Sequence, residues 1–337
     1  MRCSKESEAV RSCAMWRALA ALLIGSALVC AAAPAARAAS NALWIVDSAH
    51  QRVEEYLPSE IKKSGTPTPA AVSAGNYAYG ACFDKSNNLW VTVDGVSIVK
   101  FSASKLKKLP ISPSPAETIT SSSFVFIESC TFDKAGNLWV VDANNNSLDE
   151  ILAAHLTAGG SLTPDVIITD SAELSFADLG FLAFDKSGNL WFDGGDDEEI
   201  FQFSASQLTS TGDKTAAVVL RGGGSLYDPG QIAFDAKGNL WVTSYGFDTV
   251  VMFSTSQLGA SNNDAPAVTI SSSGMNGPFG LAFSGANLWM LNFEGGNAME
   301  FSSAQLKSSG APTPKVILTG AAGTDNWGIL FGPALGK

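Results

Sequence analysis

Short apolar stretches separated by polar turns recur along the chain with a period of about fifty residues. The most regular copy is residues 184–191, where an apolar segment ends at Phe-Asp, a polar Lys-Ser-Gly turn follows, and Asn-Leu-Trp opens the next apolar segment. Successive repeated tryptophans are 46, 49, 52, 50 and 48 residues apart, at Trp44, Trp90, Trp139, Trp191, Trp241 and Trp289. A fixed period of this size indicates a repeat architecture in which each unit packs on its neighbours.

Each repeat predicts four short strands. The first ends at Phe-Asp, as in residues 230–235, and the Asp-x-x-Gly-Asn segment after it is typical of a tight turn, because Asp accepts backbone hydrogen bonds and Gly adopts positive φ. Leu-Trp and a β-branched tail form the second strand. A third strand, one helical turn over Ser-x-Ser-Gln-Leu and a fourth strand follow. The fourth strands are expected at 166–169, 217–220, 267–270 and 316–318.

Four-stranded units repeated around an axis make a β-propeller. The chain from Asn41 onward supplies three strands of a blade without its first strand, and residues 327–331 have the form of the missing one. We therefore predict an all-β fold, a six-bladed propeller of four-stranded blades, whose ring is closed by a C-terminal strand that joins the N-terminal blade. Closure would remove the free sheet edges of an open array. A solenoid is the alternative, and the split first repeat argues against it.

Residues 1–38 are predicted to be a signal peptide, and residues 39–337 to be the propeller. Four basic residues precede an apolar run over 18–33, and Ala36-Arg37-Ala38 offers a cleavage site after Ala38. The run is a little short for a membrane anchor. We expect an exported protein, periplasmic or extracellular, with no membrane span in the mature chain. A lipoprotein cut before Cys30 is the alternative to free secretion.

The mature chain is strongly acidic. Residues 39–337 contain 16 basic and 30 acidic residues, a net charge of −14. This excess argues against nucleic acid and anionic membrane surfaces as partners. We expect a monomer that binds a small molecule or a protein.

Two cysteines, Cys82 and Cys130, remain after removal of the signal peptide. They lie in the first strands of neighbouring repeats, but one position out of phase. Because successive side chains of a strand point to opposite faces, the two are expected to point away from each other. The prediction is two buried thiols and no disulfide, although export would permit one.

The repeat resembles the NHL repeat, and the closest copy is the string Leu-Trp-Ile-Val-Asp-Ser-Ala-His-Gln-Arg-Val at residues 43–53. The resemblance covers residues 41–332 and extends to the gluconolactonase-like hydrolases and virginiamycin B lyase, which are also six-bladed. It implies a propeller fold, and it is a poor guide to function because many functions share such a fold.

Two departures from these enzymes bear on catalysis. The gluconolactonase-like family carries an Asn-Gly pair whose Asn helps hold a divalent metal, and none of the six equivalent pairs here is Asn-Gly. The lyase resemblance implies a catalytic His near the mouth of the channel. This chain has two His: His155 is expected in an outer helical turn, and His50 in a blade-one loop where NHL repeats often carry a structural His.

Loops between second and third strands, and loops that lead into first strands, are expected to share one face of the propeller, with many acids and aromatics. We predict a ligand-binding site there, and the residues chosen for it are Tyr79, Glu128, Asp178, Asp228, Phe279, Asp325 and Trp327. Three of them, Asp178, Asp228 and Asp325, share one register and are the candidate ligands of a divalent cation such as Ca²⁺, which prefers converging carboxylate oxygens. The simpler interpretation is that these acids keep an exported protein soluble.

Two functions follow from these features. The first is an exported propeller that binds a ligand or a protein partner on its acidic, aromatic-lined face, with no catalytic residues and no cofactor clearly encoded. The alternative is a metal-dependent hydrolase, lactonase or lyase of the gluconolactonase or virginiamycin B lyase type. The scarcity of His and the missing Asn-Gly pairs favour binding.

Overall fold

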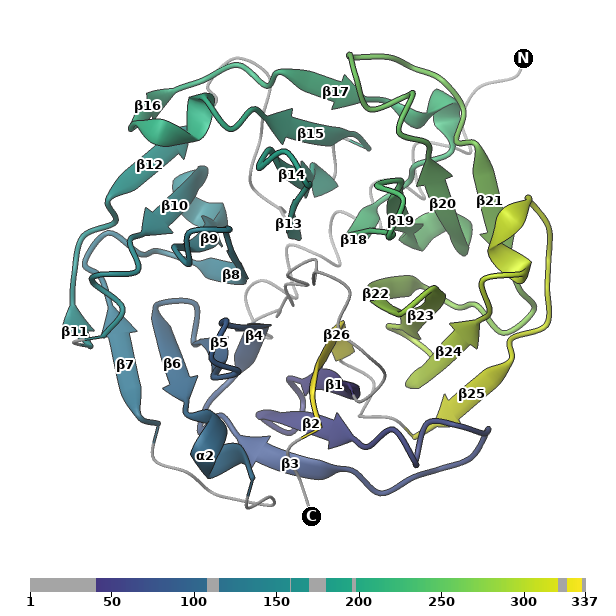
Figure 1. The fold of residues 1–337 in the computed structure, drawn as a ribbon, viewed down its shortest axis with the longest axis horizontal. Helices are drawn as coiled ribbons and strands as arrows, with labels where there is room; N and C mark the ends of the chain where they lie inside the picture. The colour runs from purple at the N-terminus through teal and green to yellow at the C-terminus, as the bar shows by residue number, and fades with distance from the viewer. Residues whose placement is uncertain are drawn as a thin grey trace, which may run out of the picture.

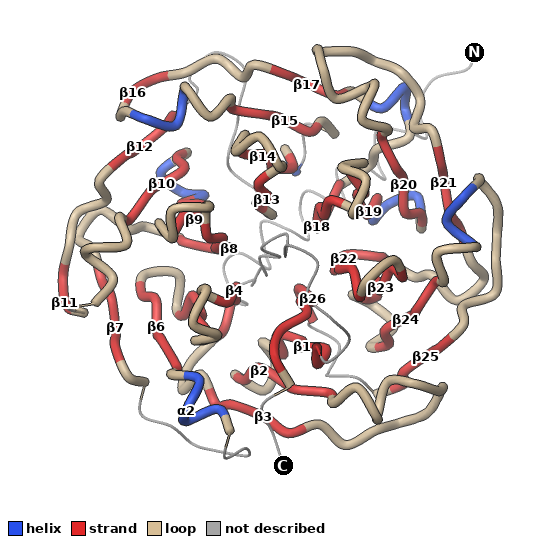
Figure 2. The backbone as a smooth tube through the Cα atoms, viewed as in Figure 1, coloured by secondary structure: helices blue, strands red, loops and turns tan. Residues whose placement is uncertain are grey.

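A computed structural model describes residues 41–107, 115–157, 159–169, 180–195, 198–320 and 326–334. The predicted signal peptide and two of the chosen site residues, Asp178 and Asp325, lie outside these ranges. Six sheets stand around a central axis (Figure 1), and strands and loops alternate regularly around the ring (Figure 2). Within the described ranges, no helix has the length and apolar character needed to cross a membrane.

Each blade has four antiparallel strands. The first three blades are β26 (Asn326–Pro333), β1 (Asn41–Asp47), β2 (Arg52–Tyr56) and β3 (Ala70–Ser73); β4 (Ala78–Phe83), β5 (Leu89–Val93), β6 (Ser97–Phe101) and β7 (Glu117–Thr120); β8 (Ile127–Phe132), β9 (Leu138–Asp142), β10 (Ser147–Ile151) and β12 (Val166–Thr169). The other three are β13 (Leu182–Phe184), β14 (Leu190–Asp193), β15 (Ile200–Phe203) and β17 (Val218–Leu220); β18 (Pro229–Phe234), β19 (Leu240–Ser244), β20 (Thr249–Phe253) and β21 (Val268–Ser271); β22 (Pro278–Ser284), β23 (Asn287–Asn292), β24 (Asn297–Phe301) and β25 (Val316–Thr319).

The ring closes as the split repeat predicts. Strand β26 is antiparallel to β1, with Leu43 opposite Phe331 and Ile45 opposite Ile329. The first blade therefore combines the two ends of the described chain, and the fold class is confirmed.

Outer strands are joined from blade to blade by a parallel contact that the sequence did not indicate. Strand β11 (Gly160–Ser161), from the third blade, pairs with β7 of the second, and β16 (Gly212–Asp213), from the fourth, pairs with β12 of the third. Single bridges repeat the arrangement at Asn262 with Leu220, Gly310 with Ile270 and Gly65 with Leu318. These pairings cover outer sheet edges that would otherwise offer unpaired backbone groups.

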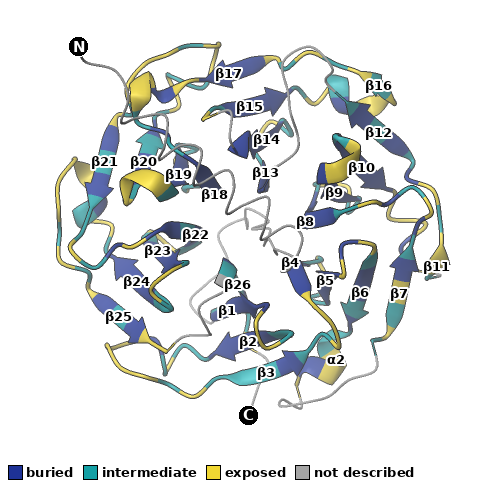
Figure 3. Cartoon of the chain, turned by 180° about the vertical axis from the view of Figure 1, so that it is seen from behind, coloured by how far each residue is buried: buried dark blue, intermediate teal, exposed yellow. Residues whose placement is uncertain are grey.

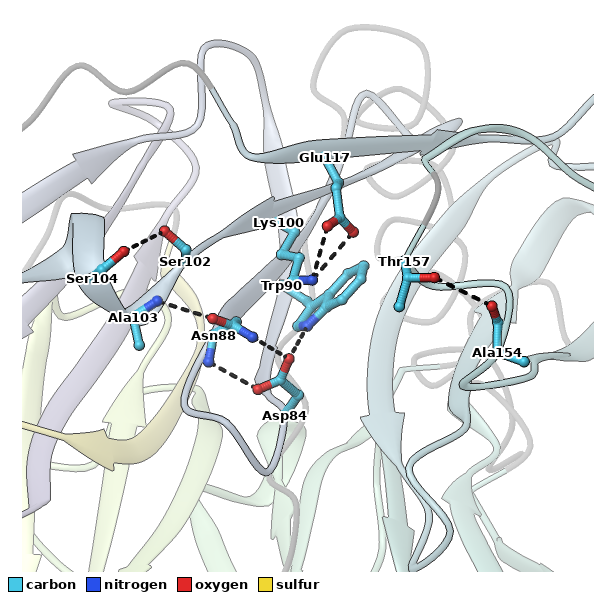
Figure 4. A network of polar contacts seen from close by, with 10 residues as sticks. All are labelled: Asp84, Asn88, Trp90, Lys100, Ser102, Ala103, Ser104, Glu117, Ala154 and Thr157. Carbon is cyan, nitrogen blue, oxygen red and sulfur yellow. Dashed lines mark hydrogen bonds and ion pairs between the residues drawn. The ribbon is translucent and has the colours of Figure 1, made fainter.

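The repeated turn is held by its aspartate. In the second blade, Asp84 accepts the backbone N–H of Asn88 at 2.9 Å, the side-chain amide of Asn88 at 2.7 Å and the indole N–H of Trp90 at 3.0 Å (Figure 4). The side-chain Oδ1 of Asn88 then accepts the N–H of Ala103, where the third strand has just ended, at 3.0 Å. The Asp-x-x-x-Asn-x-Trp spacing recurs because the aspartate accepts hydrogen bonds from the Asn and Trp side chains, and the Asn side chain accepts one from the backbone after the third strand.

Tryptophans connect the blades. The Trp of each second strand meets, edge to face, the Phe that ends the first strand of the next blade, in the pairs Trp44–Phe83, Trp90–Phe132, Trp139–Phe184, Trp191–Phe234, Trp241–Phe283 and Trp289–Phe331, with ring centroids 5.3 to 6.4 Å apart. All six tryptophans are at most 2% exposed, and Figure 3 shows the buried strands inside a more exposed rim. The repeated tryptophans therefore form the core between adjacent blades.

The helical turn predicted after the third strand is also present. It is α2 (Ala103–Leu106) in the second blade, and η4 (Gln207–Thr209) and η7 (Gln305–Lys307) in the fourth and sixth, each with a buried Leu. The preceding serine does not cap these turns with its side chain; instead Gln207 accepts the N–H and the hydroxyl of Ser204, both at 2.9 Å. Within the described ranges, the other short helices are η1 (Ala143–Asn145), η5 (Gly222–Gly224) and η6 (Tyr245–Phe247).

The prediction of two free thiols is wrong, because Cys82 and Cys130 form a disulfide with Cα atoms 6.0 Å apart. Cys82 lies opposite Trp90 and shares its face of the second blade, whereas Cys130 shares the face of Phe132 in the third. Neighbouring blades stack with the Trp face of one on the Phe face of the next. Cys82 and Cys130 lie on the two blade faces that pack against each other, so their sulfurs meet.

We predict that this disulfide stabilises the fold by joining two blades. It closes a sequence separation of 48 residues, for which the chain-entropy estimate is about 4 kcal/mol. A Cys82→Ala/Cys130→Ala double variant should lose about 2–4 kcal/mol of unfolding free energy, measured by urea denaturation. Wild-type protein measured in reductant should lose a similar amount. Two free thiols in the oxidised, denatured chain of residues 39–337, which contains only Cys82 and Cys130, would contradict the prediction.

Candidate functional site

One face of the ring is formed by loops between second and third strands and by loops that lead into first strands. The two kinds of loop are hydrogen-bonded to each other: the N–H of Asp94 donates to Tyr77, that of Ala143 to Phe126, and that of Phe293 to Gly277, at 2.8 to 3.0 Å. We call these loops, with the strand ends they join, the mouth face. The predicted shared face is thus present.

The mouth face is acidic. Its described acidic residues are Asp47, Asp94, Glu128, Asp142, Asp193, Glu198, Glu199, Asp228, Asp248 and Glu294. Its described basic residues are Arg52 and Arg221, each in an ion pair, with Asp47 at 3.1 Å and with Glu199 at 2.7 Å. The described lysines lie in turns, loops and strand ends on the opposite side. The field at this face therefore favours cations.

Several of these acids bind their own loops. Asp142, at the end of β9, accepts the N–H groups of Val125 and Phe126 at 3.0 and 2.8 Å. Asp193, at the end of β14, is buried and accepts the N–H of Phe181. Ser244 and Asn292 hold the corresponding loops in the fifth and sixth blades. The residue that ends the second strand thus anchors the loop beside it, which is a structural use of its polarity.

Burial raises the pKa of Asp193 well above its usual value, and the charge of Asp228 raises it further, against the lowering effect of the hydrogen bond from Phe181. Asp228 is 7% exposed and adopts a left-handed backbone with φ of 56°. Asp193 is buried and already accepts the N–H of Phe181, so it does not strengthen the cation site predicted around Asp228.

Both histidines pair with aspartates. The Nδ1 atom of His50 lies 2.7 Å from Asp47 Oδ2, and the same oxygen accepts Arg52 Nε at 3.1 Å. His155 lies 2.9 Å from Asp165 in the turn after β10, remote from the mouth face. The placement of His50 agrees with the structural role expected for it.

Four aromatic rings form a cluster on the mouth face over the fifth, sixth and first blades. The Trp327 ring lies 5.2 Å from that of Phe279 and 4.7 Å from that of Phe293, and Tyr245 packs edge to face on both phenylalanines. The Tyr245 hydroxyl donates to Glu294 at 2.7 Å. All four rings are partly exposed. We call them the mouth cluster.

Two buried side chains connect inner strands of different blades close to the mouth cluster. Gln231 accepts the N–H groups of Leu281 and Ile329 at 2.8 and 3.2 Å and donates to the carbonyl of Ile329 at 3.0 Å, so one side chain joins three inner strands. Phe181 packs on Phe279 at 5.4 Å. Sequence reasoning missed both residues; the available signal was their size at a position that is Gly in three other blades.

The chosen site residues that the structure describes lie in three places. Asp228 lies near Asp193. Phe279 and Trp327 belong to the mouth cluster. Tyr79 packs on Phe126 at 5.1 Å, and burial, with the nearby charges of Asp94 and Glu128, raises its pKa to about 12. Glu128 therefore lies near Tyr79, on the part of the mouth face formed by the second and third blades.

The cation site stays a prediction. Two of its three carboxylates, Asp178 and Asp325, lie outside the described ranges. Over the residues that the structure does describe, no three His, Cys, Asp or Glu side chains are grouped closely enough to hold a metal ion.

A buried carboxyl in the third blade should make stability depend on pH. Burial raises the pKa of Asp149 to about 7 from 3.8, with a further contribution from Asp142 and an opposing one from the Ser147 hydroxyl. The folded state keeps this proton where the unfolded chain has lost it, so the unfolding free energy should fall as pH rises from about 4 to about 7.

Asp149→Asn should flatten that fall and stabilise the protein at pH 8 by on the order of a few kcal/mol. Urea denaturation at several pH values measures both effects. The exposed Asp264→Asn variant is the control and should leave the profile unchanged. A D149N profile parallel to that of the wild type would contradict the assignment.

The fold and the mouth define a class: an all-β, six-bladed propeller of four-stranded repeats with an acidic, aromatic mouth face. No protein-family model matches the chain. No curated protein matches it either.

Solved structures do match. A streptogramin B lyase is 12% identical over 91% of this chain and 87% of its own, with a TM-score of 0.57. A chain of a nidogen/laminin complex is 14% identical over 87% and 98%, with a TM-score of 0.58. A catalytically inactive virginiamycin B lyase from Staphylococcus aureus with quinupristin is 14% identical over 79% and 83%, with a TM-score of 0.50. At these identities the likeness shows the fold alone.

Proposed function

We propose that this protein is an exported binding propeller that takes a positively charged ligand or protein segment on its mouth face, without catalysis. The observation that carries the proposal is the mouth cluster beside an acidic surface: four partly exposed rings, of which Tyr245 is hydrogen-bonded to Glu294. Aromatic faces attract cations through their quadrupole, and carboxylates add to that attraction. Charge complementarity of this kind selects the partner and speeds the encounter.

The geometry of the face supports binding over acid–base chemistry. Asp142 is committed to backbone N–H groups, and His50 is held by Asp47. A general base needs a group free to reach a substrate proton. The metal-dependent hydrolase or lyase remains the alternative, and its case rests on Asp228 with Asp178 and Asp325.

Solved structures of this fold include both kinds of partner: the inactive virginiamycin B lyase is in a structure with quinupristin, and another matching chain belongs to a nidogen/laminin complex. A closed ring presents six sets of loops on a rigid scaffold, which suits a binding surface. Export, predicted from residues 1–38, would place this surface in the periplasm or outside the cell.

The test is the affinity for labelled synthetic peptides of equal length that are lysine-rich, neutral or glutamate-rich, measured by fluorescence anisotropy at low and high salt. The lysine-rich peptide should bind best, and its affinity should fall as salt rises. Glu294→Gln should raise its Kd by about threefold. Trp327→Leu should raise it further by removing the central ring.

Asp264→Asn makes the same change of charge on the opposite side and serves as the matched control, with no expected effect. Equal binding of the three peptides would refute the charge argument. Unchanged binding in the W327L and E294Q variants would place the partner elsewhere.

A further inference from the structure

The sixth blade departs from the others at the turn between its first two strands. Elsewhere this turn contains the aspartate that follows the repeated Phe, but here Ser284 takes that position and the turn is one residue shorter. Strand β22 therefore passes through Gly285, with φ of 62°, directly into β23. The carboxylate present in the second to fifth blades has no counterpart in this one.

The missing carboxylate leaves an indole N–H without an acceptor. Trp90, Trp191 and Trp241 donate from Nε1 to their turn aspartates at 3.0, 3.1 and 3.4 Å. Trp289 keeps the same edge-to-face contact with the next blade, at 6.4 Å from Phe331, and is 1% exposed. Among the described residues, none accepts its indole N–H. The side chain is buried but lines a cavity, so its indole N–H can donate to an acceptor from outside the chain.

A cavity of about 330 Å³ lies at this point, on the side of the ring remote from the mouth face. Trp289 and Ser284 line it from the sixth blade, and Ile61 and Lys62 line it from the first. Trp139 also lacks an acceptor in the described structure, but its Nε1 is closed off from solvent. Trp289 differs because a ligand-sized space stands in front of it.

The charge of the cavity is positive. Lys62 is exposed and has no carboxylate partner among the described residues. Glu300 also lines the space, but one of its oxygens accepts the Asn287 amide at 2.7 Å and the other pairs with Lys315 Nζ at 3.0 Å. The uncompensated charge is thus an ammonium, next to an indole donor and the apolar surface of Ile61.

We propose that this cavity is a second binding site, specific for a small monocarboxylate with an apolar body. The ligand's carboxylate takes the place of the missing turn aspartate and accepts the N–H of Trp289 and a hydrogen bond from the Lys62 ammonium. Its apolar part packs on Ile61 and Pro58. Charge-assisted hydrogen bonds of this type discriminate against an uncharged analogue of the same shape.

The test uses the full chain and benzoate as the probe, with benzamide as the uncharged analogue, in calorimetry and tryptophan fluorescence. Benzoate should bind with one site per chain, and benzamide should bind about tenfold more weakly or not at all. Trp289→Phe, which removes the N–H and keeps a ring, should weaken benzoate binding by about tenfold. Lys62→Gln should weaken it severalfold.

Trp241→Phe is the matched control, because the Trp241 N–H already has Asp235 as acceptor. It should leave benzoate binding unchanged and should show whether loss of an indole alone perturbs the fold. Ser284→Asp restores a turn carboxylate and should abolish binding. Equal affinity for benzoate and benzamide, or W289F and S284D proteins that fold and bind benzoate like the wild type, would overturn the proposal.

Discussion

The contact between the tryptophan of one blade and the phenylalanine of the next is the interaction on which the structure depends. It occurs six times, and the last of them joins Trp289 to Phe331 and so returns to the first blade. Each pair buries two large rings in an edge-to-face geometry that is favourable beyond the area buried. Because a blade cannot bury both of its faces alone, the ring must close for any blade to be complete.

The turn aspartate serves this contact. In the second, fourth and fifth blades it satisfies the indole N–H, so the tryptophan ring is held where the next blade needs it. The same arrangement leaves the loops of the mouth face free to vary, because they take no part in it. The turn aspartates therefore lie on one side of the ring, and the variable acids and aromatics of the proposed binding face lie on the other.

The sequence was informative wherever a pattern is local and repeated. The regular spacing of the six repeated tryptophans, from Trp44 to Trp289, predicted the blades, and the split first repeat predicted their closure. The sequence-based prediction that Cys82 and Cys130 do not form a disulfide was wrong. It compared the two faces of a strand, but adjacent blades present opposite faces to each other. The role of Gln231 was out of reach, since its partners lie on two other blades. The short turn at Ser284 was visible in the sequence, but the space it leaves beside Lys62 appears only when the first and sixth blades are adjacent.

The most direct measurement of the central claim is amide hydrogen exchange along the full chain. The ring is closed by the pairing of β1 with β26 and by the contact of Trp289 with Phe331. Residues 41–47 and 326–333 should therefore exchange as slowly as residues 240–244 in the fifth blade. Rapid exchange of residues 326–333, at the rate of an unstructured tail, would show that the ring is open.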